Sequence, residues 1–335
     1  MFAPKSFKML NSGCFFVFTV FLILEYTRKS DSEIQITKKT TSIMIWFYLL
    51  IALLPVAVCL WFIYKKDKYQ PEPISKLLIA FGLGILSAPL SFLISVPLTG
   101  IGLVPAYVQS VSDAFCDAFF GAAIPEETMK LAMLWVALRW NKYFDERVDG
   151  IVYAVFVGLG FAAIENVGYM FQSGNGWAFV GLLRGLMSIP GHMIFAMIMG
   201  YFYSKAHFNE DGGEFKYYAL ALGAPILAHG LYDMILMSLD VINPGWVTGL
   251  FALLVYGMIK TYKWSVARLN EELAKDKEEW GFAEPSEKDS MFGNSYGVNY
   301  VDDDNEEGNN NNEPYNGPMP PPFPGSSPTP PPFNE

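Results

Sequence analysis

Long runs of apolar residues, separated by short charged connectors, dominate the chain from residue 44 onward. A transmembrane helix needs about 20 mostly apolar residues, because it rises about 1.5 Å per residue across a hydrocarbon core of about 30 Å. Seven runs are long enough, which predicts seven membrane-spanning helices. Their approximate bounds are 44–64, 77–104, 111–138, 150–172, 177–204, 216–238 and 245–263.

Three prolines, Pro89, Pro97 and Pro125, fall inside the second and third predicted spans. Proline has no backbone N–H and its ring clashes with the preceding turn, so we expect kinks or breaks in these spans. Pro125 also suits the start of a helix, where free backbone N–H groups offer a binding site for an oxyanion.

Basic residues occur only in alternate connectors between the predicted spans. The loops near 105–110, 173–176 and 239–244 contain no Lys or Arg, whereas the other connectors contain eleven. Because basic residues are retained on the cytosolic side, this pattern predicts a multi-pass protein of the cell membrane with a cytosolic C-terminus. The eleven are Lys65, Lys66, Lys68, Lys76, Arg139, Lys142, Arg147, Lys205, Lys216, Lys260 and Lys263.

The two ends of the chain differ from this body. Residues 1–43 contain a short apolar stretch that fits a signal peptide, a marginal anchor, or a region upstream of a true start at Met44. Residues 265–335 begin with a charged stretch and become rich in Asp and Asn, then in Pro, so we expect a disordered tail. The expected architecture is an all-α transmembrane helix bundle over residues 44–264.

The overall charge is misleading for this chain. Residues 265–335 hold 15 acidic and 4 basic residues, a net charge of −11, so the total of −10 leaves the body at +1. No basic stripe with interleaved aromatic residues is present, which argues against nucleic-acid binding. The three cysteines occur singly, without the spacing of metal or redox sites.

Eight ionisable side chains interrupt the middle four of the predicted spans. Each costs about 3 kcal/mol or more inside a membrane helix, so each needs a partner or a function. They are Glu126, Glu127 and Lys130 on the third span, Glu165 on the fourth, Arg184 and His192 on the fifth, and His229 and Asp233 on the sixth.

Counting residues from the basic ends of the spans places four of these groups at one depth. Glu126, Glu165, His192 and His229 lie 13, 15, 12 and 13 residues from those ends, which corresponds to about 18–22 Å. Helices that alternate in direction therefore bring acids and bases into one layer near the middle of the membrane. Unrelated packing residues would have little reason to gather at one depth in this way.

A second pair, Arg184 and Asp233, lies farther from the basic ends, at about 30 and 26 Å. The two side chains either form a structural salt bridge, or Asp233 hydrogen-bonds His229 one helical turn away and fixes its tautomer. The sequence leaves both alternatives open.

The third span contains an acidic pair followed by a lysine. Lys130 lies three residues after Glu127 and four after Glu126, so it can reach either on one helix face. It can fully neutralise only one of them. The other carboxylate, buried beside a like charge, is poised to act as a general base toward water.

Four motifs on these spans resemble the PrsW family of membrane proteases, which is related to the type II CAAX-prenyl and bacteriocin-processing proteases. Residues 125–130 resemble the Glu-Glu-x-x-Lys motif, and residues 161–166 resemble the Phe-x-x-x-Glu-Asn motif. His192 within Pro-Gly-His and residues 229–233 are similar to the third and fourth motifs. The resemblance covers roughly residues 44–264.

The resemblance implies an endopeptidase that cleaves a membrane-associated protein; the family's best-known substrate is an anti-sigma factor. Its partners are then a membrane-protein substrate and the lipid bilayer. The residues that we expect to be catalytic are Glu126, Glu127, Glu165, His192 and His229. The expected supporting residues are Lys130, Asn166, Asp233 and Arg184.

Two mechanisms fit these residues. In a glutamic mechanism without a metal, Glu126 or Glu127 activates water, and His192, His229 and Asn166 position the peptide and stabilise the oxyanion. In a zinc mechanism, His192, His229 and Glu165 hold the metal, although the sequence lacks HExxH. We favour the mechanism without a metal.

Two other classes of function also place ionisable residues in a membrane. Proton-coupled transporters use carboxylates and histidines near mid-membrane, but no internal repeat relates the two halves of this chain. A non-catalytic scaffold or sensor that keeps the fold is the other alternative, and it predicts that the polar layer is dispensable.

Overall fold

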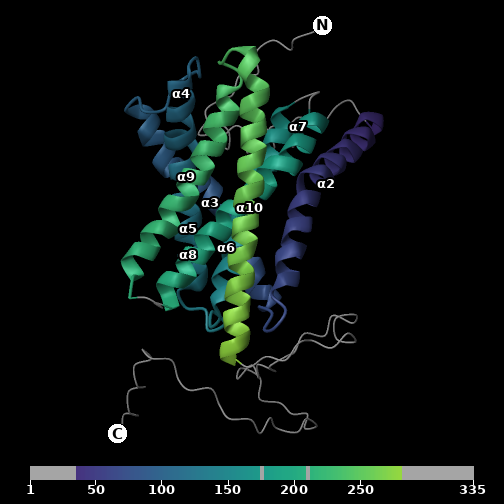
Figure 1. Ribbon diagram of the computed structural model, residues 1–335. Coiled ribbons are helices and arrows are strands. Elements are labelled where there is room, and N and C mark those ends of the chain that lie inside the picture. The colour runs from purple at the N-terminus through teal and green to yellow at the C-terminus, as the bar shows by residue number, and fades with distance from the viewer. Residues whose placement is uncertain (1–34, 174–176, 209–211, 281–335) are drawn as a thin grey trace, which may run out of the picture.

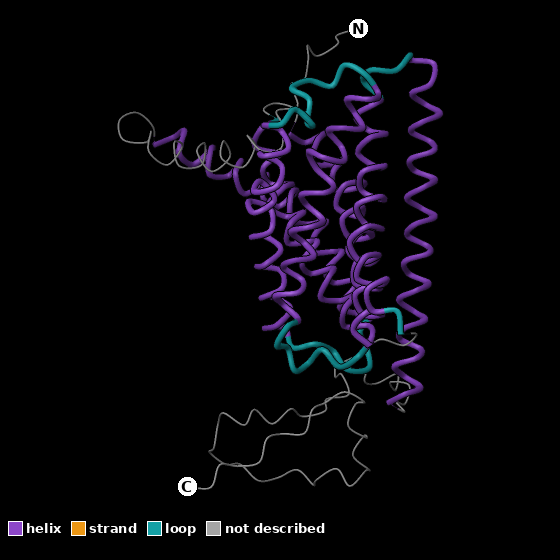
Figure 2. The backbone as a smooth tube through the Cα atoms, turned by 90° about the vertical axis from the view of Figure 1, so that its left-hand side faces the viewer, coloured by secondary structure: helices purple, strands orange, loops and turns teal. Residues whose placement is uncertain are grey.

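The structure, a computed structural model, describes residues 35–173, 177–208 and 212–280, and every regular element in these ranges is a helix. The helices run along a common axis and the loops gather at its two ends (Figures 1 and 2). The predicted all-α helix bundle is therefore confirmed. The elements are α2 (Gln35–Lys66), α3 (Ile74–Gly100), α4 (Val111–Cys116), η1 (Asp117–Ala123), α5 (Ile124–Leu138), α6 (Arg147–Gln172), α7 (Trp177–Leu183), η3 (Arg184–Ser188), α8 (Ile189–Phe208), α9 (Glu214–Ser238) and α10 (Pro244–Trp280).

Five of the seven predicted spans correspond to helices that are long and apolar enough to cross a membrane. These spans are Leu49–Lys66, Ile74–Gly100, Arg147–Gln172, Ala178–Phe208 and Glu214–Ser238. The other two predicted spans are helical as well: 111–138 comprises α4, η1 and α5, and 245–263 lies within α10.

In the described part of the chain, two helical stretches contain a π-helical turn. η1 joins α4 to α5 and ends three residues before Glu126, and η3 joins α7 to α8 and ends four residues before His192. A π-helical turn contains an extra residue, and such turns are frequent at functional sites. Both π-helical turns here lie beside the expected catalytic layer.

Of the kinks or breaks expected at the prolines, a break is absent from α3, which continues through Pro89 and Pro97. Pro125 lies in the first turn of α5, but Ala123, the last residue of η1, is already helical, so α5 continues directly from η1 and has no free N-terminus. The backbone N–H groups around Pro125 therefore do not form the free helix terminus that an oxyanion site would need.

Helix α6 forms the centre of the bundle. Of the residues in its apolar stretch, 89% are buried inside the protein, whereas only 28% are buried in α3 and in α9. Glycines allow its neighbours to approach closely. A Cβ atom on Gly160 would lie 2.1 Å from the carbonyl oxygen of Phe81 on α3, and one on Gly200 of α8 would lie 2.3 Å from the carbonyl oxygen of Gly150. Small residues at helix crossings are a common way to pack membrane helices.

Helix α10 runs along the front of the bundle (Figure 1) and continues through residues 265–280, which we assigned to the tail. Leu269, Leu273 and Asp276 on this extension are buried against the body of the protein. The remainder of the expected tail, 281–335, and residues 1–34 of the expected N-terminal extension lie outside the described residues.

Candidate active site

Glu126, Glu127 and Lys130 lie on the first two turns of α5, immediately after η1, and all three are buried. The ammonium Nζ of Lys130 lies 2.8 Å from Oε1 of Glu127 and 3.4 Å from Oε2 of Glu126. Both spacings along the helix allow a contact, and the structure shows that Lys130 lies closer to Glu127. Glu126 is therefore the less completely paired of the two glutamates.

His229 on α9 faces three carboxylates. Its Nδ1 lies 2.8 Å from Oε1 of Glu127, and its Nε2 lies 3.2 Å from Oδ2 of Asp233 and 4.0 Å from Oε2 of Glu126. An imidazolium donates from both nitrogens, which matches carboxylate acceptors on its two sides. Of the two alternatives for Asp233, the structure thus shows the contact with His229.

His192 on the first turns of α8 has a different pair of partners. Its Nδ1 lies 3.1 Å from Nζ of Lys130, and its Nε2 lies 2.9 Å from Oε2 of Glu165. A lysine ammonium has only donors, so Nδ1 must accept and the ring proton must be on Nε2, which donates to Glu165. This arrangement fixes His192 as a neutral imidazole of one tautomer.

Arg184 pairs with Glu165 rather than with Asp233. Its Nη2 lies 2.7 Å from Oε2 of Glu165, and its guanidinium carbon lies 3.8 Å from the ring centroid of Tyr169. Among the described residues, no ion pair joins Arg184 to Asp233, so the proposed outer salt bridge is wrong. Arg184 instead extends the same network that contains His192.

Asn166 lies beside this network but does not line the cavity. Its Nδ2 donates to the carbonyl oxygen of Ala52 at 2.7 Å, and its Oδ1 accepts from Nε of Arg184 at 3.0 Å. The side chain therefore ties α6 to α2 and orients Arg184. It is not placed to contact an oxyanion.

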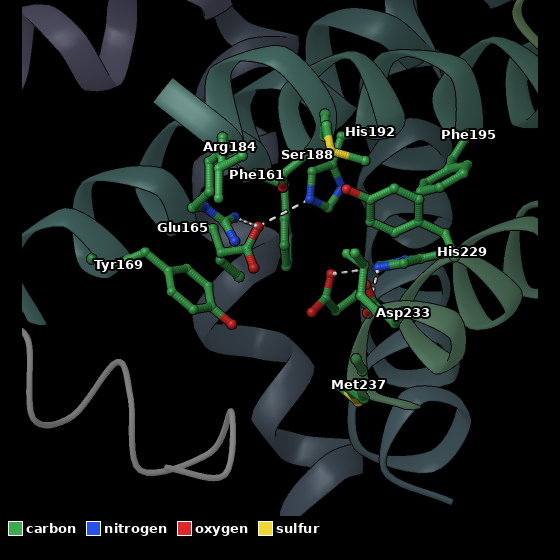
Figure 3. A pocket seen from close by; sticks show the side chains of 18 of the residues that line it. Phe161, Glu165, Tyr169, Arg184, Ser188, His192, Phe195, His229, Asp233 and Met237 are labelled. Carbon is green, nitrogen blue, oxygen red and sulfur yellow. Dashed lines mark hydrogen bonds and ion pairs between the residues drawn. The ribbon is translucent and has the colours of Figure 1, made fainter. Parts of the chain in front are cut away.

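A cavity of about 420 Å³ opens beside these groups, and its wall is mostly apolar. Figure 3 shows Glu165 of α6, His192 of α8, and His229 and Asp233 of α9 facing it. Glu126 also lines the cavity, whereas Glu127 and Lys130 do not. The acidic and basic residues that line it are Glu126, Glu165, Arg184, His192, His229 and Asp233.

Aromatic rings that were not among the expected site residues pack against the ionisable groups of the site. Phe195 stacks on His229 with 5.0 Å between ring centroids, and Nζ of Lys130 lies 4.0 Å over the ring centroid of Phe161. Phe161 belongs to a quoted motif, so its role could have been suspected. Phe195 and Tyr169 follow His192 and Glu165 by three and four residues, which is the spacing of one helical turn and is the signal that could have identified them.

Glu126, Glu127 and His229 are the part of this site that could hold a metal ion. One ligand atom from each lies within 4.8 Å of the others, and Oε2 of Glu127 is buried without a hydrogen-bond partner. Catalytic zinc sites commonly use two or three histidines, whereas this group has one, and the ammonium of Lys130 already lies 2.8 Å from Glu127. The donor set therefore matches zinc poorly.

The sequence suggested a different zinc site, formed by His192, His229 and Glu165. In the described residues, the ligand atoms of these three side chains do not all lie within 4.8 Å of one another. Nδ1 of His192 faces Lys130, and its Nε2 faces Glu165. Both ring nitrogens thus have protein partners.

The sequence comparisons agree on one group of proteins. A protein-family model described as "PrsW family intramembrane metalloprotease" matches residues 72–260. The Protease PrsW of Clostridioides difficile is 36% identical over 190 residues, which are 56% of this chain and 78% of that protein. The Protease PrsW of Bacillus subtilis is 32% identical over 202 residues (60% and 86%), and that of Geobacillus kaustophilus 32% over 231 residues (69% and 91%). No solved structure matches the chain.

Proposed function

Since this chain belongs to the PrsW family and is a multi-pass membrane protease, we propose that Glu126 is the general base that activates water for hydrolysis of the peptide bond. The observation that carries this proposal is the difference between the two neighbouring glutamates. Glu126 lines the cavity, and Glu127 is fully buried between Lys130 and His229.

The charges around the cavity favour the same assignment. Four carboxylates, of Glu126, Glu127, Glu165 and Asp233, are in contact with three cations, namely Lys130, Arg184 and an imidazolium at His229. One carboxylate therefore lacks a full countercharge. Glu126, with its nearest cation at 3.4 Å, is the one best placed to take a proton.

The proposed step is a direct attack by water. The water oxygen bonds to the carbonyl carbon of the peptide while Glu126 takes a water proton. The carbon–nitrogen bond then breaks, and Glu126 passes the proton to the leaving amine. His229 and Arg184 are the cations that line the cavity, and they stabilise the negative charge that develops on the carbonyl oxygen.

The other polar groups of the site position the two histidines rather than contact the substrate. Glu127 and Asp233 hold the two nitrogens of His229, and Lys130 together with Glu165 holds His192. Precise placement of this kind is what gives polar groups their catalytic value, since a shift of about 1 Å can cost about 100-fold in rate.

The substrate is a membrane-associated protein, and we propose that its cleaved segment enters the mostly apolar cavity at the level of this polar layer. Apolar walls with a few fixed polar groups suit a segment that leaves the lipid. Because basic residues are retained on the cytosolic side, we propose that the end of the bundle with Arg139 and Lys142 faces the cytosol. The C-terminus of α10 lies on the same side. An anti-sigma-factor-like regulator is the substrate that fits the family.

Zinc bound by Glu126, Glu127 and His229 is the alternative chemistry, in keeping with the description of the family as metalloproteases. The ammonium of Lys130 beside two of these donors counts against it. No step proposed above passes through a metal.

Reconstitution of the full chain with a single-span reporter substrate tests these assignments. We expect Glu126→Gln to lower turnover by about 100- to 10,000-fold, as for loss of a general base, while the exposed Glu278→Gln control cleaves normally. Turnover by Glu126→Gln at the wild-type rate would contradict the role of Glu126. Loss of activity on chelation, with rescue by zinc, would replace the glutamic mechanism with the metal-dependent one.

A further inference from the structure

A second group of buried acidic residues lies far from the active site, where the loop between α2 and α3 meets the start of α6 and the end of α10. Asp67, Glu146 and Asp149 form its centre, and each is at most 2% exposed. The proposed peptidase mechanism uses none of them. Glu72, Asp145 and Asp276 surround this centre.

The two central aspartates, Asp67 and Asp149, each use one carboxylate oxygen in a structural hydrogen bond. Oδ2 of Asp67 accepts from the backbone N–H of Glu72 at 3.2 Å. Oδ2 of Asp149 accepts from the backbone N–H groups of Asp145 and Glu146 at 3.1 and 2.7 Å, which caps α6. These bonds hold the loop and the start of α6 in place, but they use only one oxygen of each aspartate.

The remaining oxygens are buried without a partner. Oδ1 of Asp67, Oε1 of Glu146 and Oδ1 of Asp149 have no hydrogen-bond partner. One carboxylate oxygen of each residue lies within 4.8 Å of one from each of the other two. Burying an unpaired carboxylate is costly, and burying three together adds their mutual repulsion.

The basic side chains near this cluster are engaged with other groups. Arg147 pairs with Asp276 and Glu279, and Lys275 pairs with Glu271 and Glu272. Within residues 35–173, 177–208 and 212–280, no lysine, arginine or histidine forms an ion pair with the three central carboxylates. Lys76 and Lys142 lie over the ring of Tyr143, and Lys277 over that of Tyr69.

From this geometry we propose that Asp67, Glu146 and Asp149 bind a hard divalent cation, Mg²⁺ or Ca²⁺, at the cytosolic end of the bundle. Both ions prefer carboxylate oxygens, at about 2.1 Å for Mg²⁺ and about 2.4 Å for Ca²⁺. One oxygen from each of the three carboxylates lies within 4.8 Å of the other two, a spacing at which the three could hold one ion. The ion supplies the countercharge that the described side chains do not.

The bound cation joins two parts of the fold that also serve the active site. Asp67 follows the end of α2, and Asp149 lies on the first turn of α6, the helix that carries Glu165 and Asn166. Asn166 contacts α2 again near the other end of α6. Cation binding thus fastens α2 to α6 at one end, while Asn166 does so at the other.

The test measures thermal unfolding of the purified full chain in detergent, in chelator and with Mg²⁺, Ca²⁺ or Mn²⁺ added alone. We expect a saturable rise in melting temperature with at least one of these ions in the wild type. Asp67→Asn should remove that response, and in chelator it should melt at or above the wild-type temperature because it relieves repulsion among buried carboxylates. We expect the same two results for Glu146→Gln, which replaces Asp67→Asn in the test if that variant fails to fold.

Two controls distinguish this site from other effects of the ions. Glu278→Gln removes an exposed acid from the same end of the protein and should keep the full response. Glu127→Gln alters the other acidic group that could hold a metal and should also keep it. A wild-type melting temperature that none of the three ions changes would overturn the proposal, as would an unchanged response in Asp67→Asn and Glu146→Gln.

Discussion

Lys130 on α5 directs its ammonium toward Nδ1 of His192 on α8, 3.1 Å away, so one cation determines which nitrogen of that histidine carries the proton. Lys130→Gln can donate from its amide but has no charge and a shorter reach. We expect a fall in kcat of about 10- to 100-fold, the usual effect of losing a group that orients a functional histidine. Because Lys130 does not line the cavity, KM should change little. A rise in KM with unchanged kcat would contradict this role.

Asp233 should act through His229 rather than on the substrate. Asp233→Asn removes the carboxylate 3.2 Å from Nε2 of His229, and we expect kcat to fall by about 10- to 100-fold. In a variant that already has His229→Ala, the same substitution should cost little more, because residues that act as a unit are not additive. Equal losses in the two backgrounds would show that Asp233 works independently. Asp240→Asn, an exposed site, is the matched control.

Asn166→Ala should affect stability before chemistry. The substitution leaves the buried carbonyl oxygen of Ala52 and Nε of Arg184 without their partner. An unsatisfied buried polar group costs about 1–3 kcal/mol, so the variant should unfold at a lower temperature in detergent. Wild-type melting would mean that water or another group replaces both bonds.

The contact between α3 and α6 predicts a clear difference between two glycines. Gly160→Ala places a Cβ atom 2.1 Å from the carbonyl oxygen of Phe81, so the helices must separate, at a cost of about 1–3 kcal/mol. Gly82→Ala, on α3, meets nothing within 4 Å and should be neutral or stabilising by up to about 1 kcal/mol. Chemical denaturation or thermal melting of the two variants compares them directly.

The acidic cluster makes the stability of the cation-free protein depend on pH. Burial, with the charges of Asp276 and Asp67, raises the pKa of Glu146 to about 9, and burial raises the pKa of Glu72 to about 8. A carboxyl group with a raised pKa in the folded state binds its proton more tightly there, so its contribution to stability is complete below about pH 4.5. That contribution is lost as the pH rises toward about 9.

We therefore expect the melting temperature in chelator to fall between about pH 5 and pH 9. The measurement is a series of thermal melts of the full chain in one detergent. Glu146→Gln should flatten the slope, and Glu278→Gln should leave it unchanged. A melting temperature that rises over this range in chelator would contradict the raised pKa values.

The sequence predicted the helical bundle and the layer of polar groups because the rise per residue of a helix is constant. Counting from the basic ends was enough to bring Glu126, Glu165, His192 and His229 to one depth, where the structure shows them in one connected network. Depth alone did not say how each helix is rotated about its axis. The choice of partner for Lys130 among two nearby glutamates was therefore open.

Arg184 shows why the count failed in one place. The residue begins the π-helical turn η3, which contains more residues per turn than an α-helix, so counting at α-helical rise overstated its distance from the basic end. In the structure Arg184 pairs with Glu165 instead of Asp233. The acidic cluster around Asp67 was also missed, because periodicity does not place loop residues relative to a helix start.

The close glycine contacts of α6 also determine which helices can make way for a substrate. With its neighbours α3 and α8 at backbone distance, α6 has no space to tilt or rotate without breaking those contacts. The cavity is walled on other sides by Leu236 of α9 and Phe251 of α10, whose helices are not pinned to α6 in this way. Helix α6 is therefore the wall of the cavity that is held most closely by its neighbours.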